Sequence, residues 1–130
     1  MSSPTSEIRD GVVIIHANLS SVPGDIGMGL VDECLHVNFG SGQRRFIIDL
    51  SGANWINSTN IATLIHMQWR INQSLDPSAK LVLCGIGDRI KSILVIAKLT
   101  EAFETYDTIE KALEAFTKTA PAPSSESTRS

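Results

Sequence analysis

Three short, almost wholly apolar segments constrain this sequence more than any other feature. They are VVIIHA at 12–17, RFIIDL at 45–50 and KLVLCG at 80–85. Runs of about four to eight residues rich in Val, Ile and Leu, bounded by turn residues, are typical of buried strands. Such strands occur in parallel sheets that helices cover on both faces. The three segments therefore predict the centre of a parallel sheet.

The intervals between these segments have the periodicity of helices. Apolar residues recur at helical spacing after Asp25, Ser58, Asp88 and Asp107, and residues 103–106 are a candidate edge strand. The helix after Ser58 is expected to bury one stripe, made of Ile61, Leu64, Ile65, Ile71 and Leu75. Alternating strands and helices predict an α/β fold. We expect a mixed, mostly parallel sheet of about four strands with helices packed on it.

The two ends of the chain differ in composition from its middle. Residues 1–7 are polar, and residues 119–130 are rich in Pro, Ser and Ala without large apolar side chains. Such segments cannot bury enough surface to offset the entropy of ordering. We therefore expect a flexible N-terminus at 1–7, a single domain at 8–118 and a disordered tail at 119–130.

Charge and hydropathy exclude several kinds of partner. The net charge is −3, so the chain lacks the basic surface that nucleic acids require. No apolar run approaches the roughly 20 residues of a membrane helix. The N-terminus has no basic region followed by an apolar stretch, as a signal peptide has. We expect a cytoplasmic protein without membrane insertion, and the sequence leaves a monomer and a weak homodimer open.

Metal, cofactor and redox chemistry have no support in the sequence. Cys34 and Cys84 lie far apart, with the spacing of neither a zinc site nor a disulfide framework. His16, His36 and His66 stand in different predicted elements, without metal-ligand spacing. We therefore expect no bound metal, no cofactor and no catalytic residue.

A polar junction, NSTN at 57–60, follows the central predicted strand and opens the next helix. Sites gather at the carboxyl ends of parallel strands, so this junction is the best candidate site. A helix start offers backbone N–H groups and the positive end of the dipole, which stabilise a phosphate. Ser58 is therefore a suitable phosphoacceptor. The alternative is that Ser58 or Asn57 only caps the helix.

Three other side chains near the junction allow more than one role. Asp49 ends a predicted buried strand, but the sequence places no His or second carboxylate beside it, so a structural hydrogen bond is favoured over catalysis. Trp55 and Trp69 flank the junction. Burial is the default for both, and the alternative is a role as interface anchors, in which Trp is enriched.

From Arg44 to Phe116 the order of the predicted elements resembles the STAS domain family, whose small bacterial members are anti-sigma-factor antagonists. RRFIIDLSGANWI resembles the central strand and turn of that family, and IATLIHM resembles the following switch helix. KLVLCGIGDRIKSILVIAKL and FETYDTIEKALEAF resemble the closing strands and helices. The resemblance covers more than half of the chain.

The resemblance implies a partner-switching function without enzymatic activity. In typical members the junction reads D-S-[S/T]-G, and its first serine is phosphorylated by an anti-sigma factor that is also a serine kinase. The unphosphorylated form binds that kinase and releases the sigma factor, and a phosphatase restores this form. By position, Ser58 is the implied phosphoacceptor, with Thr59 as the alternative. The implied partner-binding residues are Trp55, Asn57, Asn60, Thr63, Met67 and Arg70, of which the last three lie on the exposed side of the helix.

The junction departs from the family pattern at two positions. Asn57 stands where the family has Asp, and Asn60 stands where it has Gly. Asn57 keeps the shape of Asp and loses its charge, while Asn60 adds a side chain. The sequence therefore leaves two interpretations open, a working phosphorylation switch and a constitutive scaffold.

Two further functional classes have a sequence rationale. One is a STAS-type accessory subunit, for example of a lipid-transport complex. The other is a small enzyme with Ser58 as nucleophile, which needs a base and an oxyanion hole. The sequence offers no evident base for Ser58.

Overall fold

The computed structural model describes residues 5–17, 24–51, 53 and 56–119. The elements in chain order are β1 (Thr5–Arg9), β2 (Val12–His16), α1 (Gly24–Gly40), β3 (Arg45–Asp49), α2 (Ser58–Gln73), β4 (Lys80–Cys84), α3 (Asp88–Ile96), β5 (Glu104–Tyr106) and α4 (Ile109–Thr119). The strands form one sheet in the order β1-β2-β3-β4-β5, in which β1 runs antiparallel to β2 and the other neighbours are parallel. The predicted α/β fold with a mixed, mostly parallel sheet is confirmed, with five strands rather than about four.

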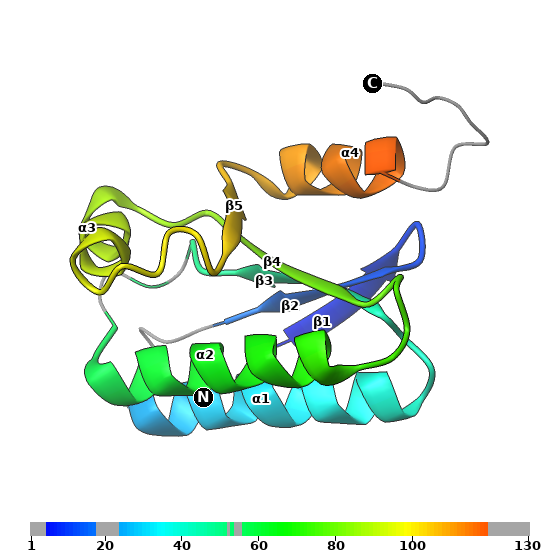
Figure 1. The fold of residues 1–130 in the computed structure, drawn as a ribbon, viewed down its shortest axis with the longest axis horizontal. Helices are drawn as coiled ribbons and strands as arrows, with labels where there is room; N and C mark the ends of the chain where they lie inside the picture. Colours follow the sequence, from blue (N-terminus) through cyan, green and yellow to red (C-terminus); the bar gives the residue numbers. More distant parts are fainter. Residues whose placement is uncertain (1–4, 18–23, 52, 54–55, 120–130) are drawn as a thin grey trace.

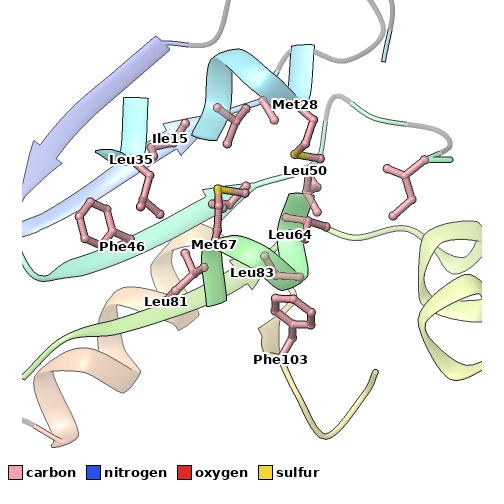
Figure 2. Packing of buried hydrophobic residues seen from close by; sticks show 14 of the residues in the cluster. Ile15, Met28, Leu35, Phe46, Leu50, Leu64, Met67, Leu81, Leu83 and Phe103 are labelled. Atoms are coloured by element: carbon pink, nitrogen blue, oxygen red, sulfur yellow. The ribbon is translucent and has the colours of Figure 1, made fainter. Parts of the chain in front are cut away.

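Helices cover both faces of the sheet. Figure 1 shows α1 and α2 side by side against one face and α4 against the other. Successive strand residues point to opposite faces, so Phe46 and Ile48 pack towards α1 and α2, while Ile47 packs towards α4. Figure 2 shows the larger of the two cores, in which Met28 of α1 and Met67 of α2 lie among the strand side chains.

The N-terminal segment corrects one prediction. The sequence indicated a flexible segment at 1–7, but Thr5–Arg9 forms β1 and pairs with β2. Asp10 and Gly11 join the two strands with φ angles of 55° and 78°. Positive φ at both residues of a two-residue Asp-Gly loop is typical of a type I′ hairpin. Every side chain of β1 is exposed, so no apolar alternation marks the strand in the sequence.

The buried stripe of α2 is rotated from the predicted one. It consists of Asn60, Leu64, Met67 and Ile71. Ile65 is 42% exposed, and Leu75 lies beyond the end of the helix and is 99% exposed. The prediction that Met67 lies on the exposed side is wrong, because its side chain is fully buried. The prediction missed this stripe because its first residue, Asn60, is polar, and polar residues are usually exposed.

Some predictions fall on residues without a described structure. Trp55 and residues 120–130 of the predicted tail lie outside the described residues. The predicted disorder of residues 120–130 therefore stays a prediction, whereas β1, which begins at Thr5, lies across the predicted domain boundary at 8. Within the described part of the chain, no helix has the length and apolarity needed to span a membrane.

Candidate functional site

The polar junction forms a reciprocal hydrogen-bonded cap at the start of α2. The N–H of Asn60 donates to Asn57 Oδ1 at 2.7 Å, and the N–H of Asn57 donates to Asn60 Oδ1 at 3.0 Å. Asn57 is the N-cap, in extended conformation, and Asn60 is the third helical residue. This is a capping box, with Asn in place of the usual Glu or Gln at the third position. The two residues that differ from the family pattern therefore act as one structural unit.

Asn57 and Asn60 are not equally accessible to a partner. The side chain of Asn60 is 1% exposed, whereas Asn57 is half-buried. Asn60 was predicted to bind a partner, but its side chain is buried and forms part of the helix cap. It can influence a partner by fixing the first helical turn, which an N-cap interaction stabilises by about 1 kcal/mol.

Ser58 and Thr59 occupy the first two helical positions and are exposed. Within the described residues, neither hydroxyl takes part in a hydrogen bond. The first turn of α2 carries no acidic residue, and its last turn carries Arg70. The positive end of the helix dipole is therefore not neutralised by a side chain of the first turn. Both hydroxyls are accessible to a modifying enzyme.

An exposed apolar stripe leads away from Ser58 along α2. Its members, here called the α2 outer stripe, are Ser58, Ala62, Ile65 and Trp69. They are spaced by four, three and four residues, which places them on one side of the helix. Ile65 is 42% exposed and Trp69 is 57% exposed. Trp69 therefore fits the interface-anchor interpretation rather than burial, and Ile65 joins it although the sequence predicted it to face inward.

Thr63 and Arg70 lie beside this stripe and have internal partners. The hydroxyl of Thr63 donates to the carbonyl of Thr59 at 3.0 Å. Arg70 Nη1 pairs with Asp32 Oδ1 of α1 at 2.9 Å, and Arg70 Nη2 lies 2.9 Å from His36 Nδ1. Arg70 thus joins α2 to α1, and its side chain is only 28% exposed.

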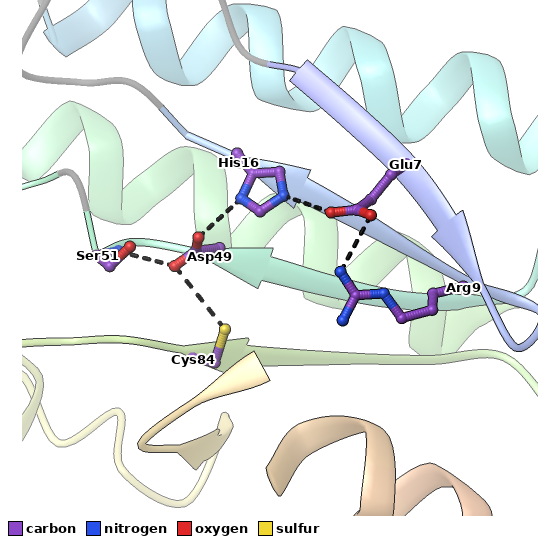
Figure 3. A network of polar contacts seen from close by, with 6 residues as sticks. All are labelled: Glu7, Arg9, His16, Asp49, Ser51 and Cys84. Carbon is purple, nitrogen blue, oxygen red and sulfur yellow. Dashed lines mark hydrogen bonds and ion pairs between the residues drawn. The ribbon is translucent and has the colours of Figure 1, made fainter. Parts of the chain in front are cut away.

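A second polar cluster, shown in Figure 3, lies at the carboxyl ends of β2 and β3. The parallel register places His16 opposite Asp49. His16 Nδ1 lies 2.8 Å from Asp49 Oδ2, and His16 Nε2 lies 3.0 Å from Glu7 Oε2 of β1. The expectation that no histidine stands beside Asp49 is therefore wrong. Each of the two residues stands next to last in a predicted buried strand, at 12–17 and at 45–50, and this shared position was the signal available in the sequence.

Asp49 also holds the start of the turn that leads to the junction. Its Oδ1 accepts a hydrogen bond from the N–H of Ser51 at 3.0 Å. Asp49 thus has structural hydrogen bonds, as the sequence predicted. The ion pair and the backbone bond together connect β1, β2, β3 and the turn.

The carboxylates and the imidazole shift each other's pKa. Burial by itself lowers the pKa of His16, but its hydrogen bonds to Glu7 and Asp49 outweigh burial and raise that pKa above the usual value. Burial by itself raises the pKa of Asp49, but the hydrogen bonds from Ser51 and His16 outweigh it and lower that pKa. The hydrogen bond from His16, together with that from Arg9, lowers the pKa of Glu7. The cluster therefore favours charged carboxylates and a charged imidazole.

Gly85, just after β4, is required by the close approach of this cluster. Its φ is +71°, and a Cβ there would lie 2.9 Å from both Asp49 Oδ1 and Ser51 Cβ. The neighbouring Cys84 is buried, and burial raises the pKa of its thiol to about 12. A thiol of this kind is not nucleophilic at neutral pH. Among the described residues, no group of His, Cys, Asp and Glu side chains could hold a metal ion.

A comparison against protein families agrees with the fold. Residues 3–112 match the family model of the STAS domain. The chain belongs to the STAS domain family. The match includes all five strands, the junction and the start of α4. A comparison with curated protein sequences finds no match.

Several solved STAS-like structures share the fold at low sequence identity. An anti-sigma-factor antagonist (STAS) domain protein from Planctomyces limnophilus is 19% identical, with a TM-score of 0.76, and the match covers 89% of this chain and 99% of that chain. A variant of RsbS from Moorella thermoacetica is 18% identical, with a TM-score of 0.73 and coverages of 90% and 97%. An anti-sigma factor antagonist from Mycobacterium paratuberculosis is 17% identical, with a TM-score of 0.66 and coverages of 88% and 93%.

Proposed function

We propose that this STAS domain is an anti-sigma-factor antagonist. In its unphosphorylated form it binds an anti-sigma factor that is also a serine kinase, and this binding releases the sigma factor. Phosphorylation of Ser58 ends the binding, and a phosphatase restores it. The domain acts in the cytoplasm as a binding partner and has no catalytic activity of its own. Family membership and two structural neighbours named anti-sigma-factor antagonists support this proposal.

The observation that carries the proposal is the position of Ser58. Its exposed hydroxyl stands at the start of α2 and also at the head of the apolar α2 outer stripe. A protein docked on Ile65 and Trp69 would therefore cover Ser58 as well. A phosphate adds about −1.5 to −2 charges, which docking would have to desolvate unless the partner supplies cations. One modification can thus remove a partner from the whole stripe.

The Asn57–Asn60 capping box supports a second candidate, a constitutive STAS scaffold. The box fixes the first turn of α2 with neutral side chains, and it gives a kinase neither the carboxylate nor the glycine of the family pattern. A scaffold would bind its partner through the same outer stripe without regulation at Ser58. The two candidates share the surface and differ only in whether Ser58 is modified.

Incubation with a candidate anti-sigma kinase and ATP, followed by intact-mass measurement, separates the candidates. We expect one phosphate on the wild type and on Thr59→Ala, and none on Ser58→Ala. Ser74→Ala, which alters a serine after the end of α2, is the control and should accept one phosphate. A stable complex without phosphate transfer would support the scaffold. Equal phosphorylation of the wild type and Ser58→Ala would remove Ser58 from the mechanism.

A further inference from the structure

The imidazole of His16 bridges two carboxylates that come from strands on either side of it. Glu7 lies in β1 and Asp49 in β3, and the sequence separates His16 from them by 9 and 33 positions. The ring nitrogens lie 3.0 Å and 2.8 Å from the two carboxylate oxygens. Figure 3 shows the ring between the two acidic side chains, with Ser51 on the far side of Asp49.

The proton count of this bridge has one consistent solution. A neutral imidazole carries one N–H and one bare nitrogen, whereas the imidazolium carries two N–H donors. Ionised carboxylates only accept hydrogen bonds. Both contacts are therefore hydrogen bonds only when His16 is protonated on both nitrogens. A neutral ring would leave a lone pair facing one carboxylate.

We infer that His16 is a proton-dependent clasp that holds the β1–β2 hairpin and, through Asp49, fixes Ser51 ahead of α2, so that partner binding at the Ser58 site responds to pH. The clasp itself is argued from the observed bridge between Glu7, His16 and Asp49. Its effect on partner binding rests on the function proposed for Ser58.

The charges around the bridge favour the protonated ring. Glu7 faces it from β1 and Asp49 from β3, while Arg9 of β1 pairs with Glu7 at 3.1 Å and offsets part of the negative charge. On the side of β4, the thiol of Cys84 lies 4.0 Å from Asp49 Oδ1. Asp107 and Glu110, before and in α4, line a hollow of about 220 Å³ together with Asp49. Lys111 of α4 pairs with Asp107 at 3.6 Å and offsets part of this charge, so acidic groups outnumber basic ones around Asp49.

Loss of the proton should release the two carboxylates unequally. The Asp49 side chain is 12% exposed, so leaving it without its imidazole donor would be costly. The Glu7 side chain is 43% exposed and retains Arg9 and water as partners. The remaining N–H therefore stays with Asp49, and the contact to Glu7 is lost. Deprotonation loosens β1 first. Asp49 also loses its positively charged partner, which helps to fix its carboxylate beside Ser51.

The sign of the pH dependence follows from the direction of the shift. The folded protein raises the pKa of His16, so the clasp is complete below the usual value of about 6.5. It is lost as the pH rises through the raised pKa. We expect partner binding to be strongest on the acidic side of this transition.

NMR titration of the imidazole nitrogens tests the clasp without any partner. At pH 6 we expect both nitrogens of His16 to be protonated, with a midpoint above about 6.5. Hydrogen-exchange protection factors of the β1 amides should fall about fivefold as His16 loses its proton, because a half-exposed ion pair has this order of strength. His66→Gln, at an exposed position of α2, is the matched control and should preserve this fall.

Two variants keep the test decisive if one of them folds poorly. His16→Gln should remove the pH dependence of β1 protection, and Glu7→Gln should lower the midpoint of His16 while keeping a side chain of the same size. A neutral His16 at pH 6 in the wild type, or the same β1 response in His16→Gln, would overturn the clasp.

Affinity for the anti-sigma kinase, measured at pH 6 and pH 8, tests the effect on the site. We expect weaker binding by the wild type at pH 8 and a smaller difference for Glu7→Gln. Binding with the same pH dependence in both proteins would overturn the coupling to the site. Absence of binding at either pH would overturn the proposed function instead, while the NMR titration still decides the clasp.

Discussion

The two polar clusters that flank the turn before α2 are built on opposite principles. The Asn57–Asn60 box is neutral and local, and its partners lie three residues apart. The Glu7–His16–Asp49 cluster is charged, and its partners come from three strands. The neutral box can fix the helix start at any pH at which the protein is folded, whereas the charged cluster depends on one proton. The neutral box therefore stabilises the start of α2, and the charged cluster is the part of the molecule that can respond to pH.

Gly85→Ala should give the largest effect, because it breaks the charged cluster by sterics. The new Cβ would lie 2.9 Å from Asp49 Oδ1, at a positive φ that disfavours side chains. We expect a loss of about 3 kcal/mol in the free energy of unfolding, measured by urea denaturation. Gly29→Ala, where a Cβ meets open space in α1, should be neutral or slightly stabilising. Equal stabilities of the two variants would contradict the close approach.

Trp69→Ala tests the surface that the neutral box positions. Removing a half-exposed anchor from the α2 outer stripe should weaken binding to the anti-sigma kinase by about 2 kcal/mol, or roughly thirtyfold. The free energy of unfolding should change by less than about 0.5 kcal/mol, as at most surface positions. Titration calorimetry and thermal unfolding provide the two readings. Leu75→Ala, an exposed apolar residue beyond the helix, should leave binding unchanged.

Asn57→Ala breaks the neutral box and should cost about 1 kcal/mol of stability. Because no ionisable group takes part in the two capping bonds, the loss should be the same at pH 6 and pH 8. Asn57→Asp keeps the acceptor and adds a charge that suits the helix start, so its stability should equal or exceed that of the wild type. Urea denaturation at both pH values measures these differences. If Asn57→Ala lowered the free energy of unfolding at only one of the two pH values, the neutral box would depend on pH as well, which would contradict its difference from the charged cluster.

His16→Gln should have the smallest effect and the only strong pH dependence of the four. Since the folded pKa of His16 is raised, the wild type should be more stable than the variant below about pH 6.5. This advantage should amount to less than about 1 kcal/mol for a partly exposed pair, and it should vanish as the pH rises through the raised pKa. Stability curves from pH 5 to pH 9 would show it. An advantage that grows with pH would reverse the account of the clasp.

The sequence predicted the features that depend on neighbouring residues or on continuous burial. The apolar runs at 12–17, 45–50 and 80–85 marked the central strands, and Ser58 marked the start of α2. β1 was not predicted, because its exposed side chains show no apolar alternation. Asp10–Gly11 is nevertheless a sequence signal for a hairpin. In this segment, the two-residue turn motif carries more information about the strand than hydrophobicity does.

The composition of the site was only partly predictable. The position of Ser58 followed from the helix start, but the fate of Asn60 did not, because a capping asparagine with 1% exposure resembles a surface residue in sequence. The pairing of His16 with Asp49 needed the register of two parallel strands, which single-sequence patterns do not specify. Long-range polar contacts were thus the main feature that the sequence left undetermined.

The proposed switch at Ser58 can be measured as the affinity of an anti-sigma kinase for the unmodified and for the Ser58-phosphorylated protein. The phosphorylated form can be prepared with the kinase and purified by charge, and both forms are then compared by titration calorimetry at pH 6. We expect tight binding of the unmodified form and at least a hundredfold weaker binding after phosphorylation, because an uncompensated charge would be buried in the interface. Equal affinities of the two forms would contradict the switch.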